Sequence, residues 1–370
     1  MPLTRSPLTR SAFLSLLLLC AATLVAPASQ AKAPVKKNPP LKKVLAADDS
    51  GEFANFAQWS EAAPFIERMA TVHQFDRQEV RQALSQVRFV DRAVQLVKPA
   101  PPDRPKNWQA YRARFVEPVR IQAGVQFWDR YQQALASAEE QFGVPAEIIV
   151  GILGVETIYG RNTGNFRVMD AIGTLAFAYP GAPNRVARME YFKSELENVL
   201  LYAREEQIDP FSLTGSYAGA IGWPQFMPGS IRRFAVDFDG DHHIDLRNSP
   251  VDAIGSVANF LLQHGWERGL PVAFAASVRE GGDWPALLNQ GLKAGYTLDE
   301  MSAAGASPIL AAPADLRYGL VDLQNGAEPT EYWLGTGNFF AITQYNRSYF
   351  YAMSVLELGR AVRAAREAQR

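Results

Sequence analysis

Residues 143–160 read GVPAEIIVGILGVETIYG, a segment that is apolar along most of its length and carries Glu156 among apolar neighbours. The three- and four-residue spacing of a helix would place Glu156 on one face with Ile149 and Ile152. A helix that lacks a polar side is expected in the protein core. The segment therefore predicts a buried helix with an ionisable group on it.

Glu156 allows two interpretations. Burying a carboxylate costs free energy unless the group is paired or protonated, and burial raises the carboxyl pKa. A glutamate with a raised pKa is a good general acid at neutral pH. Alternatively, Glu156 forms a structural ion pair with Arg161 or Arg167. This segment alone leaves both interpretations open.

A second unusual stretch is TGSYAGAIGWPQFMPGS, residues 214–230. It is rich in glycine, contains several aromatic residues, and carries the polar groups of Ser216, Tyr217 and Gln225. Aromatic faces beside amide and hydroxyl groups suit a sugar-binding cleft, and glycines let the backbone approach a ligand closely. The alternative is a tightly packed loop that only supports the fold.

Several segments, taken in order along the chain, resemble the lytic murein transglycosylase B family. They are GVPAEIIVGILGVETIYGR, DAIGTLAFAYP, GSYAGAIGWPQFMPGS, SPVDAIGSVANF and YWLGTGNFFAITQYNRSYFYAM, and the similarity runs from about Trp108 to Val362. The resemblance implies a mainly α (α+β) fold. It would consist of a lysozyme-like core, a flanking α-helical domain and a small β-containing subdomain.

The resemblance also implies an enzyme that cleaves the β-1,4 bond from N-acetylmuramic acid to N-acetylglucosamine in the glycan strands of peptidoglycan. Glu156, from the GVET motif, would be the catalytic residue, and catalysis would need no cofactor. The expected substrate-binding residues are Ser216, Gln225, Asn338, Tyr345, Tyr111, Tyr191, Tyr217 and Phe226. The segment GAPNRVARME is longer than the corresponding link in the family, which puts contacts by Arg185 and Arg188 in doubt.

A single carboxyl group suffices for this reaction. Glu156 would protonate the leaving oxygen, and the resulting carboxylate would take the proton of the sugar's own C6 hydroxyl, which closes a 1,6-anhydro ring. The intramolecular nucleophile has a high effective molarity and replaces an activated water. The N-acetyl oxygen of the substrate could share the charge at C1, oriented by Ser216 or Asn338. The alternatives are a muramidase that uses water, a non-catalytic glycan-binding protein and a calcium-dependent interaction module.

Residues 237–245, DFDGDHHID, form a candidate calcium loop. Calcium binds six to eight oxygen ligands, which EF-hand loops supply at alternating positions. The expected ligands are Asp237, Asp239, Asp241, the carbonyl of His243, Asp245 and, as the resemblance suggests, Asp252. Glycine at the fourth position and Asn248 at the twelfth depart from the EF-hand pattern. The alternative is a solvated acidic turn.

The N-terminus has the layout of a secretory signal peptide over residues 1–31, with Arg5 and Arg10 followed by an apolar run and small residues. This predicts a periplasmic protein. Cys20 is the only cysteine and follows Leu19 rather than a small residue, so membrane association through a lipidated Cys20, as in an outer-membrane lipoprotein, is the less favoured alternative. A net charge of −1 gives no indication of nucleic acid as a partner.

The rest of the chain suggests a division into domains, and the protein is expected to be a monomer. A linker over 32–52, with five lysines in KAPVKKNPPLKK, follows the signal peptide. Helical periodicity assigns 53–118 plus 353–370 to the α-helical domain. The lysozyme-like core is expected at 119–266 plus 328–352. Residues 267–327, where PVAFAAS and YGLVDL look like strands, form the expected β-containing subdomain.

Overall fold

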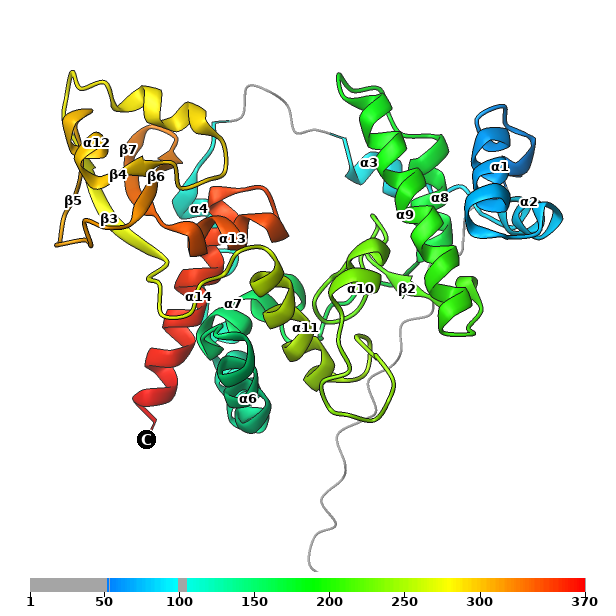
Figure 1. Cartoon of the computed structure of the whole chain (residues 1–370), viewed down its shortest axis with the longest axis horizontal. Helices are drawn as coiled ribbons and strands as arrows, with labels where there is room; N and C mark the ends of the chain where they lie inside the picture. Colours follow the sequence, from blue (N-terminus) through cyan, green and yellow to red (C-terminus); the bar gives the residue numbers. More distant parts are fainter. Residues whose placement is uncertain (1–51, 53, 99–104, 370) are drawn as a thin grey trace, which may run out of the picture. The chain divides into compact units, whose positions relative to one another are not determined.

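The computed structural model describes residues 52, 54–98 and 105–369 (Figure 1). The expected signal peptide at 1–31 and nearly all of the expected linker lie outside these residues, so both stay predictions. Helices dominate the described part, with one small sheet, as the sequence indicates. Within the described part, no helix combines the length and the apolar character that crossing a membrane requires.

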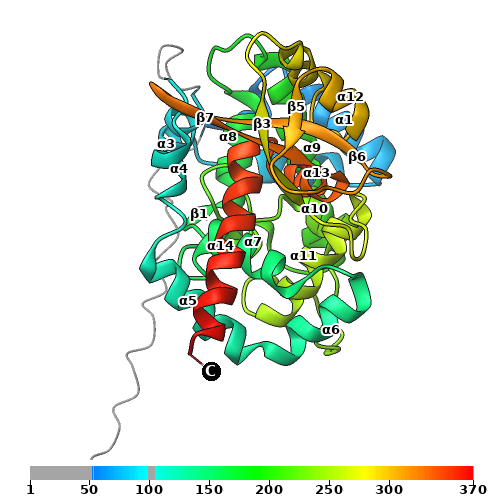
Figure 2. The same cartoon turned by 90° about the vertical axis from the view of Figure 1, so that its left-hand side faces the viewer.

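Two helices form the centre of the molecule. Helix α7 (Ala146–Thr157) is the buried helix predicted from the sequence, and it packs against the C-terminal helix α14 (Tyr349–Glu367), as the two views show (Figures 1 and 2). Glycines make this contact close. A Cβ on Gly151 would lie 2.3 Å from the carbonyl oxygen of Val355, and one on Gly359 would lie 2.2 Å from that of Glu147.

The end of α7 is sharply defined. Ile158 and Tyr159 both have positive φ angles of 52° and 54°, and Gly160 follows at 76°, so the helix cannot continue. The Thr157 hydroxyl donates to the carbonyl oxygen of Trp223 over 3.0 Å and accepts from the amide of Gly160. These contacts tie the last turn of α7, which carries Glu156, to the glycine-rich loop of residues 214–230.

The N-terminal helices pack against a second helical layer. Helices α1 (Ala62–His73), α2 (Arg77–Ser85) and α3 (Asp91–Leu96) lie beside α8 (Val168–Phe177) and α9 (Arg185–Glu205). The Val90 amide donates to the Thr174 hydroxyl over 3.1 Å, and Arg68 forms an ion pair with Glu197 at 2.7 Å. The N-terminal helices therefore contact the segment that we expected to form the core.

The remaining helices surround the central pair. Helix α5 (Pro118–Arg130) packs against both α7 and α14. The other α-helices are α4 (Trp108–Arg112), α6 (Gln132–Phe142), α10 (Pro228–Phe234), α11 (Pro250–Gln263), α12 (Leu298–Ala303) and α13 (Gly337–Tyr345). Short 3-10 helices are η1 (Phe56–Gln58), η2 (Pro210–Ser212) and η3 (Trp284–Gln290).

The sheet contains five antiparallel strands in the order β4-β6-β7-β3-β5. They are β3 (Ala273–Val278), β4 (Tyr296–Thr297), β5 (Ala306–Pro308), β6 (Arg317–Asn325) and β7 (Glu328–Gly335). The two predicted strands correspond to β3 and β6. A separate two-stranded ladder joins β1 (Phe166–Arg167) to β2 (Thr214–Gly215), which anchors the start of the glycine-rich loop.

Two expected domain boundaries need correction. Residue 353 falls inside α14, which packs mainly on α7 and α5 rather than on the helices between residues 54 and 98. Residues 328–335, which we expected in the core, form β7 between β6 and β3. Both errors arise because helical or strand periodicity identifies an element but not the partner that it packs against.

The glycine contact between α7 and α14 is testable through stability. Gly151→Ala should lower the free energy of unfolding by about 1–3 kcal/mol, because the added Cβ collides with a backbone carbonyl that cannot move independently. Urea unfolding followed by circular dichroism measures this. Gly181→Ala is the matched control, since nothing lies within 4 Å of its Cβ position. Equal stability of the two variants would contradict the packing argument.

Candidate active site

Glu156 lies in the last turn of α7, with its side chain partly accessible. Burial raises the pKa of its carboxyl group to about 7, and the hydrogen bond from Tyr351 acts in the opposite direction. The C-terminal end of a helix carries partial negative charge, so this position also disfavours the carboxylate form. Glu156 can therefore exist in both protonation states near neutral pH.

The ion-pair interpretation of Glu156 is wrong. Arg167 pairs with the buried Asp170 at 3.1 Å instead. Arg161 forms no ion pair with Glu156, and across residues 54–98 and 105–369 no lysine, arginine or histidine lies in salt-bridge contact with this carboxyl group. What contacts it is a hydroxyl: Tyr351 on α14 donates to Oε1 over 2.6 Å.

Three tyrosines gather around Glu156. The rings of Tyr345 and Tyr351 stack with centroids 6.2 Å apart, and the Tyr345 hydroxyl donates to the carbonyl oxygen of Pro224 over 2.6 Å. Burial, followed by the nearby charge of Glu156, raises the pKa of both phenols. Tyr111 on α4 is also close enough for Glu156 to raise its pKa, after the larger effect of burial. The structure thus places Tyr345 and Tyr111, two of the expected substrate-binding residues, near Glu156.

The glycine-rich loop carries two of the expected polar groups, Ser216 and Gln225. The Ser216 oxygen accepts hydrogen bonds from the amides of Ala218 and Ala220, which leaves its hydrogen available to donate to a ligand. Gln225 has a φ of 52°, and its amide nitrogen donates to the carbonyl oxygens of Thr163 and Gly222. A non-glycine residue in this conformation is typical of functional loops.

A hollow next to these residues, which we call the cleft pocket, brings together parts of α9, α10, α11, α13 and the glycine-rich loop. Tyr345 from α13, Gln225 from the glycine-rich loop and Tyr191 from α9 all line it. The lining residues are Tyr191, Gln225, Phe226, Met227, Ser230, Arg233, Phe234, Phe260, His264, Gln344 and Tyr345. Three of the expected substrate-binding residues therefore share one pocket with Tyr345.

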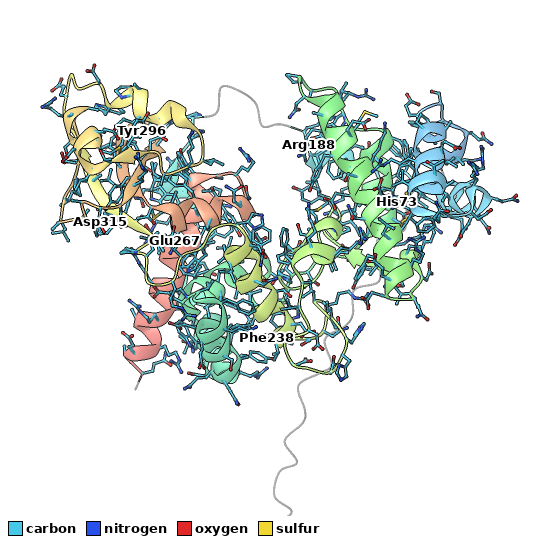
Figure 3. The ribbon with its side chains drawn as sticks, in the orientation of Figure 1. His73, Arg188, Phe238, Glu267, Tyr296 and Asp315 are labelled. Carbon is cyan, nitrogen blue, oxygen red and sulfur yellow. The ribbon has the colours of Figure 1, made fainter. Side chains whose placement is uncertain are left out.

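Phe226, Tyr217 and Arg188 differ in how far they are exposed and in what they contact. Phe226 lines the cleft pocket but is only 2% exposed, and its ring packs on Phe260 and Tyr345, so it supports the wall more than it faces a ligand. Tyr217 is exposed and free to meet a glycan. Arg188, labelled on α9 in Figure 3, lies over the rings of Tyr179, Tyr191 and Phe192.

Asn338 requires a correction. It is fully buried in α13. Its side-chain oxygen accepts from the amide of Glu267 over 2.7 Å, and its nitrogen donates to the carbonyl oxygens of Glu267 and Leu270 over 2.8 Å each. Both donors of the amide group are therefore occupied by backbone. Asn338 fixes the chain after α11 and has no group left to orient a substrate.

The acidic loop partly fits a cation. Carboxylate oxygens of Asp237, Asp239 and Asp252 lie within 4.8 Å of one another, and Phe238, labelled in Figure 3, belongs to this loop. Asp252 is almost fully buried. Burial raises its pKa, and the charge of Asp239 adds to this effect after the backbone hydrogen bonds that lower it. Carboxylate oxygens are the ligands that calcium prefers, so these three residues could hold it.

The side chains of Asp241, Asp245 and His243 make contacts outside this group of three. Asp241 accepts from the amide of His243, and both oxygens of Asp245 are used by Arg247 and Asn248. The His243 ring points toward Glu206, with 3.3 Å between Nδ1 and Oε2. Among the described residues, the group of side chains that could hold a cation thus contains three of the five expected side-chain ligands, Asp237, Asp239 and Asp252.

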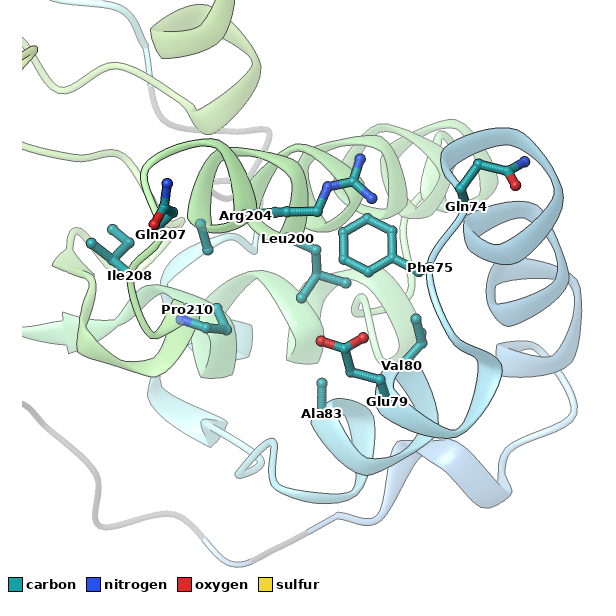
Figure 4. A pocket seen from close by; sticks show the side chains of 11 residues that line it. Gln74, Phe75, Glu79, Val80, Ala83, Leu200, Arg204, Gln207, Ile208 and Pro210 are labelled. Atoms are coloured by element: carbon teal, nitrogen blue, oxygen red, sulfur yellow. The ribbon is translucent and has the colours of Figure 1, made fainter.

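Another hollow lies between α2 and the end of α9 (Figure 4). Phe75, Val80 and Leu200 form its apolar part, and the Arg204 guanidinium lies 4.1 Å from the centre of the Phe75 ring. None of its lining residues belongs to the group around Glu156. This hollow therefore adds nothing to the candidate active site.

Tyr351 is a site residue that the sequence alone does not indicate. It is the second tyrosine of the motif YFYAM, but nothing in the order of residues shows that it reaches an acid 195 positions away. An acid of raised pKa in a cleft of tyrosines and hydrogen-bonding groups is the arrangement of a lysozyme-like enzyme that acts on polysaccharide.

Comparison with known proteins agrees with this class. Residues 55–360 match the family described as Transglycosylase SLT domain. The chain is 45% identical over 324 residues to membrane-bound lytic murein transglycosylase B of Escherichia coli (strain K12), covering 85% of each protein. The chain therefore belongs to the transglycosylase SLT family of peptidoglycan lytic transglycosylases.

Solved structures confirm the fold. Catenated lytic transglycosylase SltB1 from Pseudomonas aeruginosa superposes with a TM-score of 0.76 at 42% identity, covering 84% of this chain and 99% of that one. The Escherichia coli lytic transglycosylase SLT35 in complex with calcium gives a TM-score of 0.73 at 43% identity, covering 90% and 100%. The predicted mainly helical, lysozyme-like fold is confirmed.

The hydrogen bond between Tyr351 and Glu156 can be tested directly. Tyr351→Phe should raise the pKa of Glu156 further, because it removes the one contact that favours the carboxylate. Carbon-13 NMR of labelled glutamate measures this titration. Tyr349→Phe is the control, since that hydroxyl bonds to Gly291 instead. An unchanged or lowered pKa in Tyr351→Phe would contradict the geometry.

Proposed function

We propose that this protein is an exported lytic transglycosylase in which Glu156 cleaves the β-1,4 bond from N-acetylmuramic acid to N-acetylglucosamine. The observation that carries the proposal is Glu156 itself, a partly exposed residue whose carboxyl pKa is raised by burial to about 7 and which has no salt-bridge partner among the described residues. Membership of the transglycosylase SLT family supports the same reaction.

The first step uses the protonated form of Glu156. Its proton passes to the glycosidic oxygen, the bond from that oxygen to C1 breaks, and positive charge develops on the muramic acid ring. Tyr351 then donates its hydrogen bond to the carboxylate that remains, which stabilises the charge inside the protein. A raised pKa makes the proton available at neutral pH.

The second step uses the same group as a base. The Glu156 carboxylate takes the proton of the C6 hydroxyl, the C6 oxygen bonds to C1, and the 1,6-anhydro product leaves with Glu156 protonated again. The Ser216 hydroxyl orients the N-acetyl oxygen of the substrate, since its hydrogen is free to donate. Tyr111, Tyr191 and Tyr217 offer ring faces to the sugars, and Gln225 lines the same cleft pocket.

Two other functions remain as outcomes of the experiment. A muramidase would use the same acid but let water attack C1, which gives reducing ends. A glycan-binding protein without activity would have no use for an acid whose burial costs stability. The raised pKa of Glu156 favours the enzyme over the binding protein.

Activity should depend on Glu156 and on pH in a defined way. Glu156→Gln should reduce the turnover of purified peptidoglycan at least about 100-fold, because an amide cannot transfer the proton. In the wild type, kcat/KM should fall as the pH rises through about 7, where the free enzyme loses that proton. The rate at which soluble fragments are released, measured from about pH 5 to about pH 9, tests this.

Stability provides the control for folding. The pKa of Glu156 is raised above its ordinary value of 4.5, so ionisation destabilises the folded state as the pH rises from 4.5 to about 7. Glu156→Gln should therefore melt at a higher temperature than the wild type at pH 8 and at a similar temperature below pH 4.5. Full activity of the variant, or a wild-type rate that rises above pH 7, would contradict the role of Glu156.

The acidic loop is proposed to bind a structural calcium ion. The cluster of Asp237, Asp239 and Asp252 supports this, and SLT35 of Escherichia coli has been crystallised in complex with calcium. Asp252 also accepts from the backbone amides of Phe238 and Asp245, so it couples the cation to the loop conformation. Catalysis itself would use no cofactor.

Calcium should raise the melting temperature by several degrees, because an ion that binds only the folded state stabilises it. Differential scanning calorimetry with and without EDTA measures this shift. Asp239→Ala should abolish the response, whereas Asp241→Ala, outside the cluster, should keep most of it. A wild-type melting temperature that ignores calcium would refute the site.

The proposed location is the periplasm. Its basis is the signal peptide expected at residues 1–31, which lies outside the described residues. The Escherichia coli relative is membrane-bound, so lipidation of Cys20 remains the alternative route to a membrane. The glycan strands of peptidoglycan are the proposed partner, and the protein would act as a monomer.

A further inference from the structure

The cleft pocket contains a positively charged side chain, Arg233, that has no role in the proposed cleavage steps. Arg233 lies on α10, and its side chain lines the pocket together with Tyr191, Gln344 and Tyr345. Tyr345 also stacks on Tyr351, which holds Glu156, so one tyrosine separates this pocket from the acid. Arg233 therefore places a positive charge in a pocket that shares Tyr345 with the group around Glu156.

The Arg233 guanidinium is held in place but not neutralised. Its Nε donates to the carbonyl oxygen of Gly229 over 2.9 Å, and its Cζ lies 5.3 Å from the centre of the Phe234 ring. Within residues 105–369 and the other described segments, no carboxylate forms a salt bridge with it. The remaining donors of the guanidinium are therefore available to a ligand.

The adjacent arginine on α10, Arg232, is paired with a carboxylate. Arg232 donates to both oxygens of Glu205, at 2.8 and 2.7 Å, and to the side-chain oxygen of Asn198. That arginine fastens α10 to α9 and is satisfied within the protein. The contrast between two adjacent arginines identifies Arg233 as the one with a free charge.

Glu195 is the nearest acid, and it does not cancel this charge. It is only 5% exposed, and it accepts from the amide of Gly229 over 2.8 Å. Burial raises its pKa, whereas the backbone hydrogen bond and the charge of Arg233 lower it. Glu195 thus fixes the start of α10 beside the pocket, and among the described residues it forms no salt bridge with Arg233.

We propose that the cleft pocket binds a carboxylate of the peptide stem that muramic acid carries, with Arg233 as the anion-binding side chain. This rests on the proposed function, because it concerns the same substrate. The sugar rings are neutral, so within a stem-bearing strand the negative charges lie on the peptide. Arginine suits a carboxylate because its planar fork can donate two parallel hydrogen bonds. Ser230 and Gln344 supply further polar groups at the same wall.

The experiment compares two forms of one defined glycan fragment, with the stem carboxylates either free or converted to amides. The wild type should show a kcat/KM about tenfold higher for the free form, the size expected for one partly solvated charge-assisted hydrogen bond. Arg233→Gln should bring the free form down to the rate of the amide form. Arg233→Lys, which keeps the charge but loses the fork, should retain part of the preference.

Arg232→Gln is the matched control and should retain the full preference, since that side chain pairs with Glu205. A wild type without preference, or an Arg233→Gln variant that loses equally on both forms, would overturn the proposal. Anhydro products from the wild type with either form confirm the reaction independently. Their absence from both forms would refute the proposed function rather than the stem site.

Discussion

The hydrogen bond from Tyr351 to Glu156 is the interaction on which the active-site geometry depends. It joins two helices whose backbones approach closely at Gly151 and Gly359, where a Cβ would clash with a carbonyl oxygen of the other helix. The acid is thereby held at the end of α7 in surroundings that raise its pKa, while one hydroxyl moderates the effect. A rigid helix pair thus sets both the position and the proton affinity of the group.

The walls of the cleft follow from the same packing. Tyr345 stacks on Tyr351 and donates to Pro224, which connects α13, α14 and the glycine-rich loop. Thr157, next to the acid, binds the same loop through Trp223. The carboxyl group of Glu156, its tyrosines and the polar loop therefore form one connected unit. In the proposed mechanism, such preorganisation would allow a single carboxyl group to donate and then accept a proton without rearrangement.

The local sequence pattern predicted the helices and strands better than it predicted which segments they pack against. The apolar run around Glu156, the strands β3 and β6, and the cleft positions of Tyr345 and Gln225 could be found from the sequence and its family resemblance. Asn338 could not be judged, because only the fold shows that backbone groups occupy its amide. Tyr351 and the packing of α14 depend on contacts between distant segments, which periodicity does not encode.

The most direct test of the account is mass spectrometry of the fragments that the wild type and Glu156→Gln release from purified peptidoglycan. If one carboxyl group acts as acid and then as base, the wild type must produce 1,6-anhydro-muramyl ends and the variant almost none. Reducing ends from the wild type would show that water, not the C6 hydroxyl, attacks C1. Anhydro ends from both proteins in equal amount would contradict the central role of Glu156.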